Sequence, residues 1–454
     1  MKDYEDFFKG KKITLLGLGL LGRGVGDAEF LAPLAKELII TDKKTKEELA
    51  SSLKRLRKFT NIRYTLGKHD LADFRDVDMV IKAAGVALDS PEIAAARQAG
   101  VPVYMSTALF AKFAMEAGAT IVGVTGTRGK STVAHMIHHA FVQAGKRAHL
   151  GGNIRGKSTL AMLGDVQEGD ICVLELDSWQ LQGFGEARIS PNIAVFTNFM
   201  PDHLNYYRSD MNTYFADKAN IFKFQRPGDV LIVGASVAER IRVANPPLDP
   251  IVPEQISRKW KLKIIGEHNR KNASLVATAL QAAGLSDEEI QEGIESFEGV
   301  EGRLQFLREI NGVKIYNDNN ATTPEATIAA LQTLQETRII LILGGTDKGL
   351  DMRDLISLIN QRCKAVVLLA GSGTDSLLQA IPSSRAKLAT GQASYKLQAP
   401  TRGPFNSLNQ ATSAALELAK EGDVVLFSPA FASFGMFKNE YDRNDQFLAL
   451  IRKL

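Results

Sequence analysis

Short apolar runs alternate with longer Ala- and Leu-rich stretches from one end of the chain to the other. The runs are apolar at nearly every position, which predicts strands buried on both faces rather than the two-residue alternation of an antiparallel sandwich. The stretches between them have the composition of helices. The pattern therefore predicts an α/β protein with mostly parallel sheets. The expected strands are Ile13–Leu16, Leu38–Thr41, Met79–Ala83, Ile121–Val124, Ile171–Leu174, Ile193–Thr197, Ile339–Leu343, Ala365–Ala370 and Val424–Ser428.

Three of these strands run directly into glycine-rich turns, at Gly17–Gly22, Gly126–Gly129 and Gly344–Gly349. Each turn is a plausible start of a separate domain that handles a nucleotide or a phosphate. The chain has 454 residues, and at roughly 150 residues per domain this length also suggests about three domains. We therefore expect domains at residues 1–106, 107–300 and 301–454.

Composition narrows the class of protein. The chain is 45% hydrophobic and 23% charged, which excludes disorder or fibrous structure as the main state. A formal net charge of +4 is too weak to argue for a nucleic-acid groove. The cysteines, Cys172 and Cys363, cannot build a disulfide framework and indicate reduced thiols in a cytoplasm. Met1–Lys12 lacks the apolar core of a signal peptide, and no apolar run approaches a membrane span. We expect a soluble cytoplasmic protein.

The first glycine motif follows Ile13–Leu16 and fits the G-x-G-x-x-G pattern, from Gly17 to Gly22. Such glycines let a backbone approach a diphosphate at a helix N-terminus, and Asp42 at the end of the second strand can accept from a sugar or a base. Lys43 and Lys44 add positive charge for a phosphate. Taken alone, the motif is equally well explained by a ligand-binding loop or by a tight strand–helix turn that binds nothing. If it binds a dinucleotide, NAD is the usual one.

The second glycine motif is a stronger indication of ATP. The amides of such a loop cradle phosphate oxygens, Lys130 neutralises them and the Ser131 hydroxyl ligates Mg²⁺. The strict pattern requires glycine at the position of Val124, so the generic motif fails there, but the core G-T-x-G-K-S follows a strand as required. The residues expected to bind ATP here are Gly126, Thr127, Arg128, Gly129, Lys130, Ser131 and Thr132.

The second motif and further segments resemble, in the same order, those of the Mur ligase family, which also includes the folylpolyglutamate synthases. Together they cover nearly the whole chain. One departure is Asp177, which stands where the family usually has serine. The matching segments are Gly151–Ile154, Glu175–Gln180, Thr197–Leu204, Tyr214–Phe222 and Gly266–Asn272.

The resemblance implies that Glu175 and His203 bind Mg²⁺ beside Ser131. A buried glutamate at a strand end is costly unless it is paired or binds a metal, and a structural Glu–His hydrogen bond is the alternative. The family's lysine at the position of Lys218 is carbamylated by CO₂, which adds a carboxylate to the Mg²⁺ site. A neutral amine must attack CO₂, so this requires a lowered pKa; an ordinary solvated lysine is the alternative. The expected catalytic residues are Lys130, Glu175, His203 and Lys218.

Four more residues complete the expected ATP site. Asn269 and Asn272 are three residues apart and share one helix face, where two amides can read the edge of adenine. Helix capping would explain one of them but not the pair. By resemblance, Arg303 reaches the ATP phosphates and Asp318 holds the ribose.

The C-terminal segments resemble those of family members that add glutamate to UDP-N-acetylmuramoyl-L-alanine. The resemblance implies that Thr322 and Lys348 bind the glutamate side-chain carboxylate and that Ser433 lies near its α-carboxylate. Phe434 is also expected to bind the substrate. The departures cluster in this pocket, with Asn320 for Lys, Phe431 for Cys, Gly435 for Asp and Glu440–Tyr441 in reversed order, so D- against L-glutamate stays open. The UDP substrate is expected to contact Gly17, Leu20, Leu21, Asp42, Lys43, Lys44, Asn153 and Gln180.

The resemblance thus implies an α/β ligase with a Rossmann-like domain for the UDP substrate, a central P-loop ATPase-type domain for ATP and Mg²⁺, and a Rossmann-like domain for glutamate. We expect an ATP-dependent acid–amino-acid ligase of cytoplasmic peptidoglycan synthesis that acts as a monomer through an acyl phosphate. The alternatives are an L-glutamate-adding ligase, a folylpolyglutamate-type ligase and an NAD-dependent oxidoreductase, which would leave the second motif unexplained. A non-catalytic nucleotide-binding regulator would not need Glu175, His203 and Lys218 together.

Overall fold

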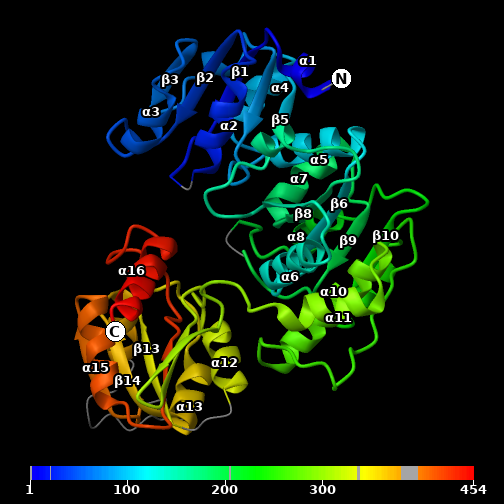
Figure 1. Ribbon diagram of the computed structural model, residues 1–454. Helices are drawn as coiled ribbons and strands as arrows, with labels where there is room; N and C mark the ends of the chain where they lie inside the picture. Colours follow the sequence, from blue (N-terminus) through cyan, green and yellow to red (C-terminus); the bar gives the residue numbers. More distant parts are fainter. Residues whose placement is uncertain (1–2, 21, 204–205, 335–337, 380–396) are drawn as a thin grey trace. The chain divides into compact units, whose positions relative to one another are not determined.

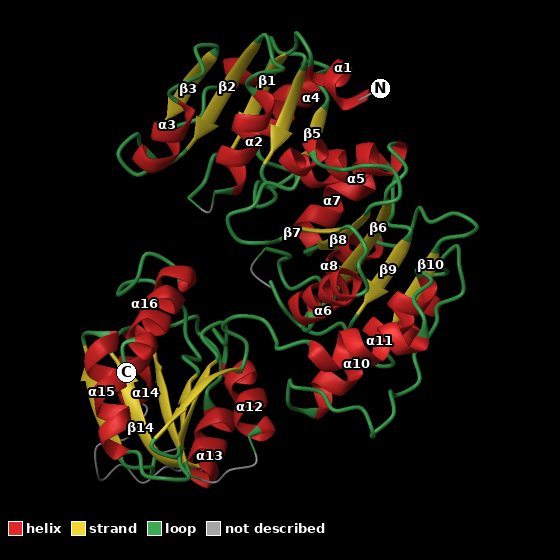
Figure 2. Ribbon diagram, in the orientation of Figure 1, coloured by secondary structure: helices red, strands yellow, loops and turns green. Residues whose placement is uncertain are grey.

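The computed structural model describes residues 3–20, 22–203, 206–334, 338–379 and 397–454. The chain forms two compact units, one of Met1–Leu262 with His268–Phe297 and one of Lys263–Glu267 with Glu298–Leu454. Both are layered α/β structures in which helices cover the faces of a sheet (Figure 1, Figure 2).

The first sheet of the first unit is five-stranded and parallel, in the order β3-β2-β1-β4-β5. The chain order reverses between β1 and β4, and in open parallel sheets ligands bind outside the carboxyl ends of the strands at such a switch point. The elements are α1 (Asp3–Phe8), β1 (Lys12–Leu16), α2 (Arg23–Leu31), β2 (Glu37–Asp42), α3 (Ala50–Leu56), β3 (Ile62–Leu66), the 3₁₀ turn η1 (Leu71–Phe74), β4 (Met79–Lys82), α4 (Pro91–Gln98) and β5 (Val103–Met105).

The second sheet of this unit is also five-stranded and parallel, in the order β10-β9-β6-β8-β7. One apolar core runs through both sheets and includes Ile13, Leu109 and Phe196. The elements are α5 (Ser106–Glu116), β6 (Thr120–Thr125), α6 (Lys130–Gln143), β7 (Ala148–Gly152), η2 (Leu160–Gly164), β8 (Ile171–Glu175), α7 (Ser178–Ala187), β9 (Ile193–Phe196), α8 (Met211–Ala219), β10 (Val230–Val233), α9 (Ala238–Val243), α10 (Glu267–Ala282) and α11 (Asp287–Ser296).

The second unit contains a six-stranded sheet in the order β11-β12-β16-β13-β14-β15, in which only the β11–β12 pairing is antiparallel. Successive residues of β13 enter different apolar cores, Leu341 on one face and Ile340 on the other. The elements are β11 (Gln305–Ile310), β12 (Val313–Asn317), α12 (Pro324–Thr333), β13 (Ile339–Gly344), α13 (Arg353–Arg362), β14 (Cys363–Leu369), α14 (Ser372–Gln379), β15 (Thr401–Phe405), α15 (Leu408–Leu418), β16 (Val424–Phe427) and α16 (Glu440–Arg452).

The predicted α/β class with mostly parallel sheets is confirmed, and each expected strand is a strand to within a few residues at its ends. The strands that the apolar pattern missed are short, polar or at a sheet edge. In the edge strand β3, for example, Arg63 and Tyr64 are exposed. Within the described residues, no helix is both long and apolar enough to cross a membrane. The domain boundaries expected at residues 106 and 300 stay predictions.

Candidate functional site

The loop between β6 and α6 is a tight glycine turn. Gly126 has φ 138° and Gly129 has φ 83° and is the N-cap of α6. A Cβ on Gly126 would lie 2.0 Å from Oγ1 of Thr197, so only glycine fits. The turn therefore leads directly into the N-terminus of a 14-residue helix. Backbone N–H groups of a glycine turn at a helix N-terminus bind phosphate.

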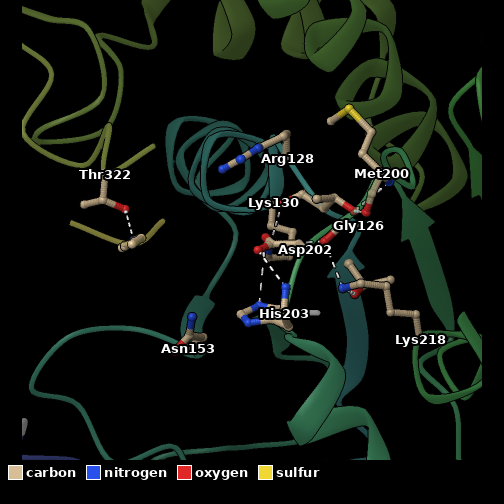
Figure 3. A network of polar contacts seen from close by, with 12 residues as sticks. Gly126, Arg128, Lys130, Asn153, Met200, Asp202, His203, Lys218 and Thr322 are labelled. Carbon is tan, nitrogen blue, oxygen red and sulfur yellow. Dashed lines mark hydrogen bonds and ion pairs between the residues drawn. The ribbon is translucent and has the colours of Figure 1, made fainter. Parts of the chain in front are cut away.

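The segment after β9 holds this loop in place. The amides of Thr127 and Arg128 donate to the backbone oxygen (2.9 Å) and the side-chain Oδ1 (2.8 Å) of Asn198. The hydroxyl of Thr197 donates to the Arg128 carbonyl at 2.5 Å, and the amide of Met200 donates to Oγ1 of Thr127 at 2.9 Å. Figure 3 shows Met200 beside the loop. These bonds fix the conformation of the loop.

Two lysines converge on one carbonyl of this loop. Lys130 donates from Nζ to the carbonyls of Gly126 (3.1 Å) and Thr127 (3.0 Å). Lys218 of α8 donates to the same Gly126 carbonyl at 2.9 Å (Figure 3). Only 1% of Lys218 is exposed. Burial, and then the charge of Lys130, hold the pKa of Lys218 well below its ordinary value. A larger share of this amine is therefore neutral and nucleophilic at neutral pH than for an exposed lysine.

Glu175 and His203 have the chemistry of metal ligands. The Glu175 carboxylate is buried at the end of β8, and its Oε1 accepts one long hydrogen bond, from Nδ2 of Asn153 at 3.5 Å. Burial lowers the pKa of His203, whose ring lies 4.8 Å from the Trp179 ring between centroids. A carboxylate with free lone pairs and a neutral imidazole suit a divalent cation. Among the described side chains, no group of three or more His, Cys, Asp and Glu is placed to hold a metal.

The two asparagines of α10 meet the same loop. Asn272 donates from Nδ2 to Oδ1 of Asn269 at 3.2 Å, so the pair shares one helix face as expected. A Cβ on Gly129 would lie 2.7 Å from Oδ1 of Asn272. The structure therefore brings Asn272 against the start of α6, where Ser131 is buried and Thr132 half-buried.

The first glycine loop is bound to the end of β2. Gly17, Gly19 and Gly22 all have positive φ, and Gly22 is the N-cap of α2. The Asp42 carboxylate accepts from the amides of Gly19 and Lys44, each at 2.9 Å. Asp42 therefore closes the loop, a structural task that its sequence position did not reveal.

The remaining predicted contacts of the UDP substrate differ in exposure. Leu20 is 51% exposed and Lys43 is exposed as well. Gln180 is buried, and its amide is engaged in the capping box of α7 with Asp177 and in a bond to Oγ1 of Thr107 at 3.2 Å. Asp177, the departure from serine, acts as the helix N-cap. Leu21 lies outside the described residues.

In the second unit, the predicted glutamate residues occupy loops that follow the strands. Lys348 donates from Nζ to Oγ1 of Thr322 at 3.1 Å, so two residues 26 apart meet as expected. Thr346 forms a β-bridge with Ala432, which joins the loop after β13 to the segment that carries Ser433. Ser433 is buried and the Phe434 side chain is 60% exposed.

Asp318 is buried, and its two oxygens accept from the Leu304 amide (2.9 Å) and from Oγ of Ser428 (2.8 Å). Burial raises its pKa to about 7. Arg303 is exposed, and its positive charge acts in the opposite direction by lowering the pKa of Asp318. The expected ATP residues thus lie in both units, with Arg303 and Asp318 in the second.

Sequence reasoning missed Arg443, which has no exposed surface. Its guanidinium donates to Oδ1 and to the backbone oxygen of Asn319, at 2.8 and 2.9 Å, and to the carbonyl of Phe431 at 3.2 Å. It therefore connects the segment of Asp318 and Thr322 to the segment of Ser433. An arginine in a largely polar helix gave no signal of burial. Sequence reasoning also missed Arg23, whose guanidinium reaches Asn153.

Comparisons with known proteins cover nearly the whole chain. Residues 11–105, 124–247 and 302–431 match family models described as the MurD-like N-terminal domain of Mur ligases, the Mur ligase middle domain and the Mur ligase glutamate ligase domain. UDP-N-acetylmuramoylalanine–D-glutamate ligases of Roseiflexus sp. (strain RS-1) and Borreliella burgdorferi (strain ZS7) are each 34% identical to the chain. The alignment with the Roseiflexus protein covers 97% of the chain and 98% of that relative. The alignment with the Borreliella protein covers 99% of both.

Among solved structures, the UDP-N-acetylmuramate–alanine ligase of Thermotoga maritima has a similar fold. Its TM-score is 0.60 at 19% identity, and the alignment covers 98% of this chain and 99% of that protein. This likeness concerns the fold alone.

Proposed function

We propose, since the chain belongs to the Mur ligase family, that it is an ATP-dependent ligase joining glutamate to UDP-N-acetylmuramoyl-L-alanine. The observation that carries the proposal is the similarity, over nearly the full length, to relatives named for this reaction with D-glutamate. D-glutamate is therefore the proposed isomer. The work is divided among residues 1–106 for the UDP substrate, 107–300 for ATP and Mg²⁺ and 301–454 for glutamate. The enzyme acts as a monomer in the cytoplasm.

The loop after β6 supports the proposed ATP site. Residues Gly126–Thr132 hold the phosphates at the start of α6, and Lys130 neutralises the transferring phosphoryl group. Asn272 stands against Gly129 and, with Asn269, contacts the adenine. Arg303 is proposed to contact the ATP phosphates, and Asp318 the ribose.

Glu175, His203 and Ser131 are the proposed Mg²⁺ ligands. Mg²⁺ supplies charge neutralisation on the phosphate oxygens when bound. Lys218 joins this set after carbamylation: its neutral amine adds to CO₂ and loses a proton, which leaves a carbamate anion. The low pKa and burial of Lys218 support this step.

The reaction proceeds in two transfers. A carboxylate oxygen of the alanine attacks the γ-phosphorus of ATP, and ADP leaves, giving an acyl phosphate. The neutral glutamate amine then attacks the acyl carbon, loses a proton, and inorganic phosphate leaves. The Lys348–Thr322 contact at 3.1 Å supports this proposal, because a neighbouring cation and hydroxyl suit the side-chain carboxylate of glutamate. Ser433 is the proposed residue near its α-carboxylate, and Phe434 also binds the substrate.

Phosphate release from ATP tests this proposal. The enzyme is mixed with UDP-N-acetylmuramoyl-L-alanine and either D- or L-glutamate, and release is expected with the D isomer. Release with L-glutamate alone would transfer the assignment to the L-adding ligase. No release with either isomer, or nicotinamide reduction instead, would defeat the proposal.

Chemical rescue tests the role of Lys218. Lys218→Ala is expected to lose phosphate release and to regain part of it with small carboxylic acids, which replace the carbamate. Lys223→Ala, which removes an exposed lysine just beyond the same helix, is the matched control. Full activity of Lys218→Ala without any added acid would show that no carbamate is needed.

A further inference from the structure

Arg23 lies between the first glycine loop and the edge of the second sheet. It directly follows Gly22 and is the first residue of α2. Its Nη1 donates to Oδ1 of Asn153 at 2.8 Å. Asn153 follows β7, and its backbone N–H donates to the backbone carbonyl of Glu175 at 2.8 Å. Arg23 therefore bridges the first glycine loop and Asn153, both of which are proposed to contact the UDP substrate.

Close backbone packing holds Arg23 at this place. A Cβ on Gly22 would lie 3.2 Å from Cα of Gly156, and a Cβ on Gly26 would lie 2.7 Å from Cβ of Ser158. Larger residues at these two glycines would push α2 away from the segment after β7. The start of α2 is thus packed against the second sheet's loop, and the half-buried guanidinium is kept beside Asn153.

The guanidinium of Arg23 has few hydrogen-bond partners within the protein. Among the described residues, its guanidinium makes one hydrogen bond, to a neutral amide, and no ion pair within 4.0 Å. The acid on the same helix face is Asp27, which is buried and accepts from Oγ of Ser158 at 2.5 Å. Burial raises the pKa of Asp27 to about 6, while the charge of Arg23 acts in the opposite direction, so Asp27 is mostly ionised at neutral pH and interacts with Arg23 without a direct hydrogen bond. A guanidinium has five N–H donors, and most of these remain available to a ligand.

We infer that Arg23 binds an anionic oxygen of the UDP-sugar substrate, which rests on the proposed function. A planar guanidinium pairs with phosphate or carboxylate through two parallel hydrogen bonds. The diphosphate is the favoured partner, because Arg23 begins the helix whose N-terminus follows the glycine loop and attracts anions. The bond to Asn153 orients the fork for that contact. The acyl carboxylate is the other anion of this substrate.

Equilibrium binding without ATP or metal tests the inference on the full chain. Calorimetry measures the affinity of UDP and of UDP-N-acetylmuramoyl-L-alanine for the wild type, Arg23→Met and Arg23→Lys. Arg23→Met is expected to weaken both ligands by about tenfold to a hundredfold, the effect of a lost charge-assisted pair. Arg23→Lys is expected to lose less affinity, because it keeps the positive charge but not the planar set of donors that forms two parallel hydrogen bonds.

Arg55→Met is the matched control, since Arg55 forms its ion pair with Glu29 of the same helix at 2.5 Å but away from the glycine loop. It is expected to bind both ligands as the wild type does. Unchanged ATP affinity and thermal unfolding of Arg23→Met show that the fold is intact.

Each other outcome has a separate meaning. Loss of affinity for the full substrate with unchanged UDP affinity overturns the diphosphate assignment and places the carboxylate at Arg23. Unchanged affinity for both ligands overturns the inference entirely. A wild-type protein that binds neither ligand contradicts the proposed function rather than the role of Arg23.

Discussion

Lys82 offers a quantitative test of how the burial of a charged side chain changes its pKa and the stability of this fold. It ends β4 beside β1 and is 1% exposed. Its ammonium donates to the carbonyls of Val86 (2.9 Å), Ala83 (3.4 Å) and Ala84 (3.5 Å). These bonds are made to neutral oxygens, so they offset only part of the cost of removing the charge from water. Burial accordingly lowers the pKa of Lys82 from 10.5 to about 8.

The size of the effect follows from proton linkage. Between pH 8 and pH 10.5 the unfolded chain holds more protons on Lys82 than the folded protein does, so stability rises with pH in this window. Integrating from pH 7 to pH 10 gives a gain of roughly 2–3 kcal/mol from this one group. Lys82→Met removes that gain. It also leaves the carbonyls without their donor, at a cost that does not depend on pH and amounts to roughly 1–3 kcal/mol for each unsatisfied acceptor.

Urea denaturation at pH 7 and pH 10 measures the two free energies of unfolding. Trp179 and Trp260, the tryptophans of the chain, both belong to the unit that contains Lys82, so their fluorescence follows its unfolding. The wild type is expected to gain roughly 2–3 kcal/mol relative to Lys82→Met from pH 7 to pH 10. Lys68→Met, which removes an exposed lysine of the same sheet's loops, controls for the lost charge. A difference that stays constant with pH would refute the reasoning from burial.

Three further predictions concern glycine geometry, thiols and a buried guanidinium. Gly126→Ala is expected to abolish ATP binding in a fluorescent-nucleotide assay, because the added Cβ would lie 2.0 Å from Oγ1 of Thr197. The control is Gly145→Ala, at φ 69° with no atom within 4 Å of the added Cβ, which is expected to lose about 1 kcal/mol of stability and to bind ATP normally. Burial raises the pKa of Cys172 and Cys363 to about 12, so mass spectrometry should find slow alkylation at pH 8 in the folded protein and fast alkylation in urea; equal rates would contradict this. Arg443→Met is expected to lower the calorimetric unfolding temperature of the second unit, by removing about 3 kcal/mol of stability with its hydrogen bonds; an unchanged transition would disprove it.

Much of the fold was predictable because the apolar runs of buried parallel strands are contiguous in sequence. The central strands β1, β6 and β13 are buried at nearly every residue, and continuous apolar runs mark them. The edge strands carry weaker signals. In β15, Gly403 and Pro404 lie within a mostly exposed strand, and such residues normally indicate a turn.

The candidate site was predictable to the extent that it is local or that its residues resemble a known family. Gly126–Thr132 is one continuous stretch, so spacing alone predicts a phosphate loop. The pairing of Lys348 with Thr322 was expected from resemblance, and the structure places the two groups 3.1 Å apart. Composition and spacing gave no indication of Arg443, because the burial of a single polar residue depends on what packs over its helix.

The sequence by itself thus determined the order of strands and glycine turns and the residue types that each turn carries. Only the tertiary structure decided which distant groups meet. Lys218 reaches Gly126 across 92 positions, and Arg23 reaches Asn153 across 130. The physical reason is that a turn or a helix face is set by neighbours along the chain, whereas these meetings depend on helices packing on two sheets that share one apolar core. The same packing buries Lys82 and Lys218 and so lowers their pKa values.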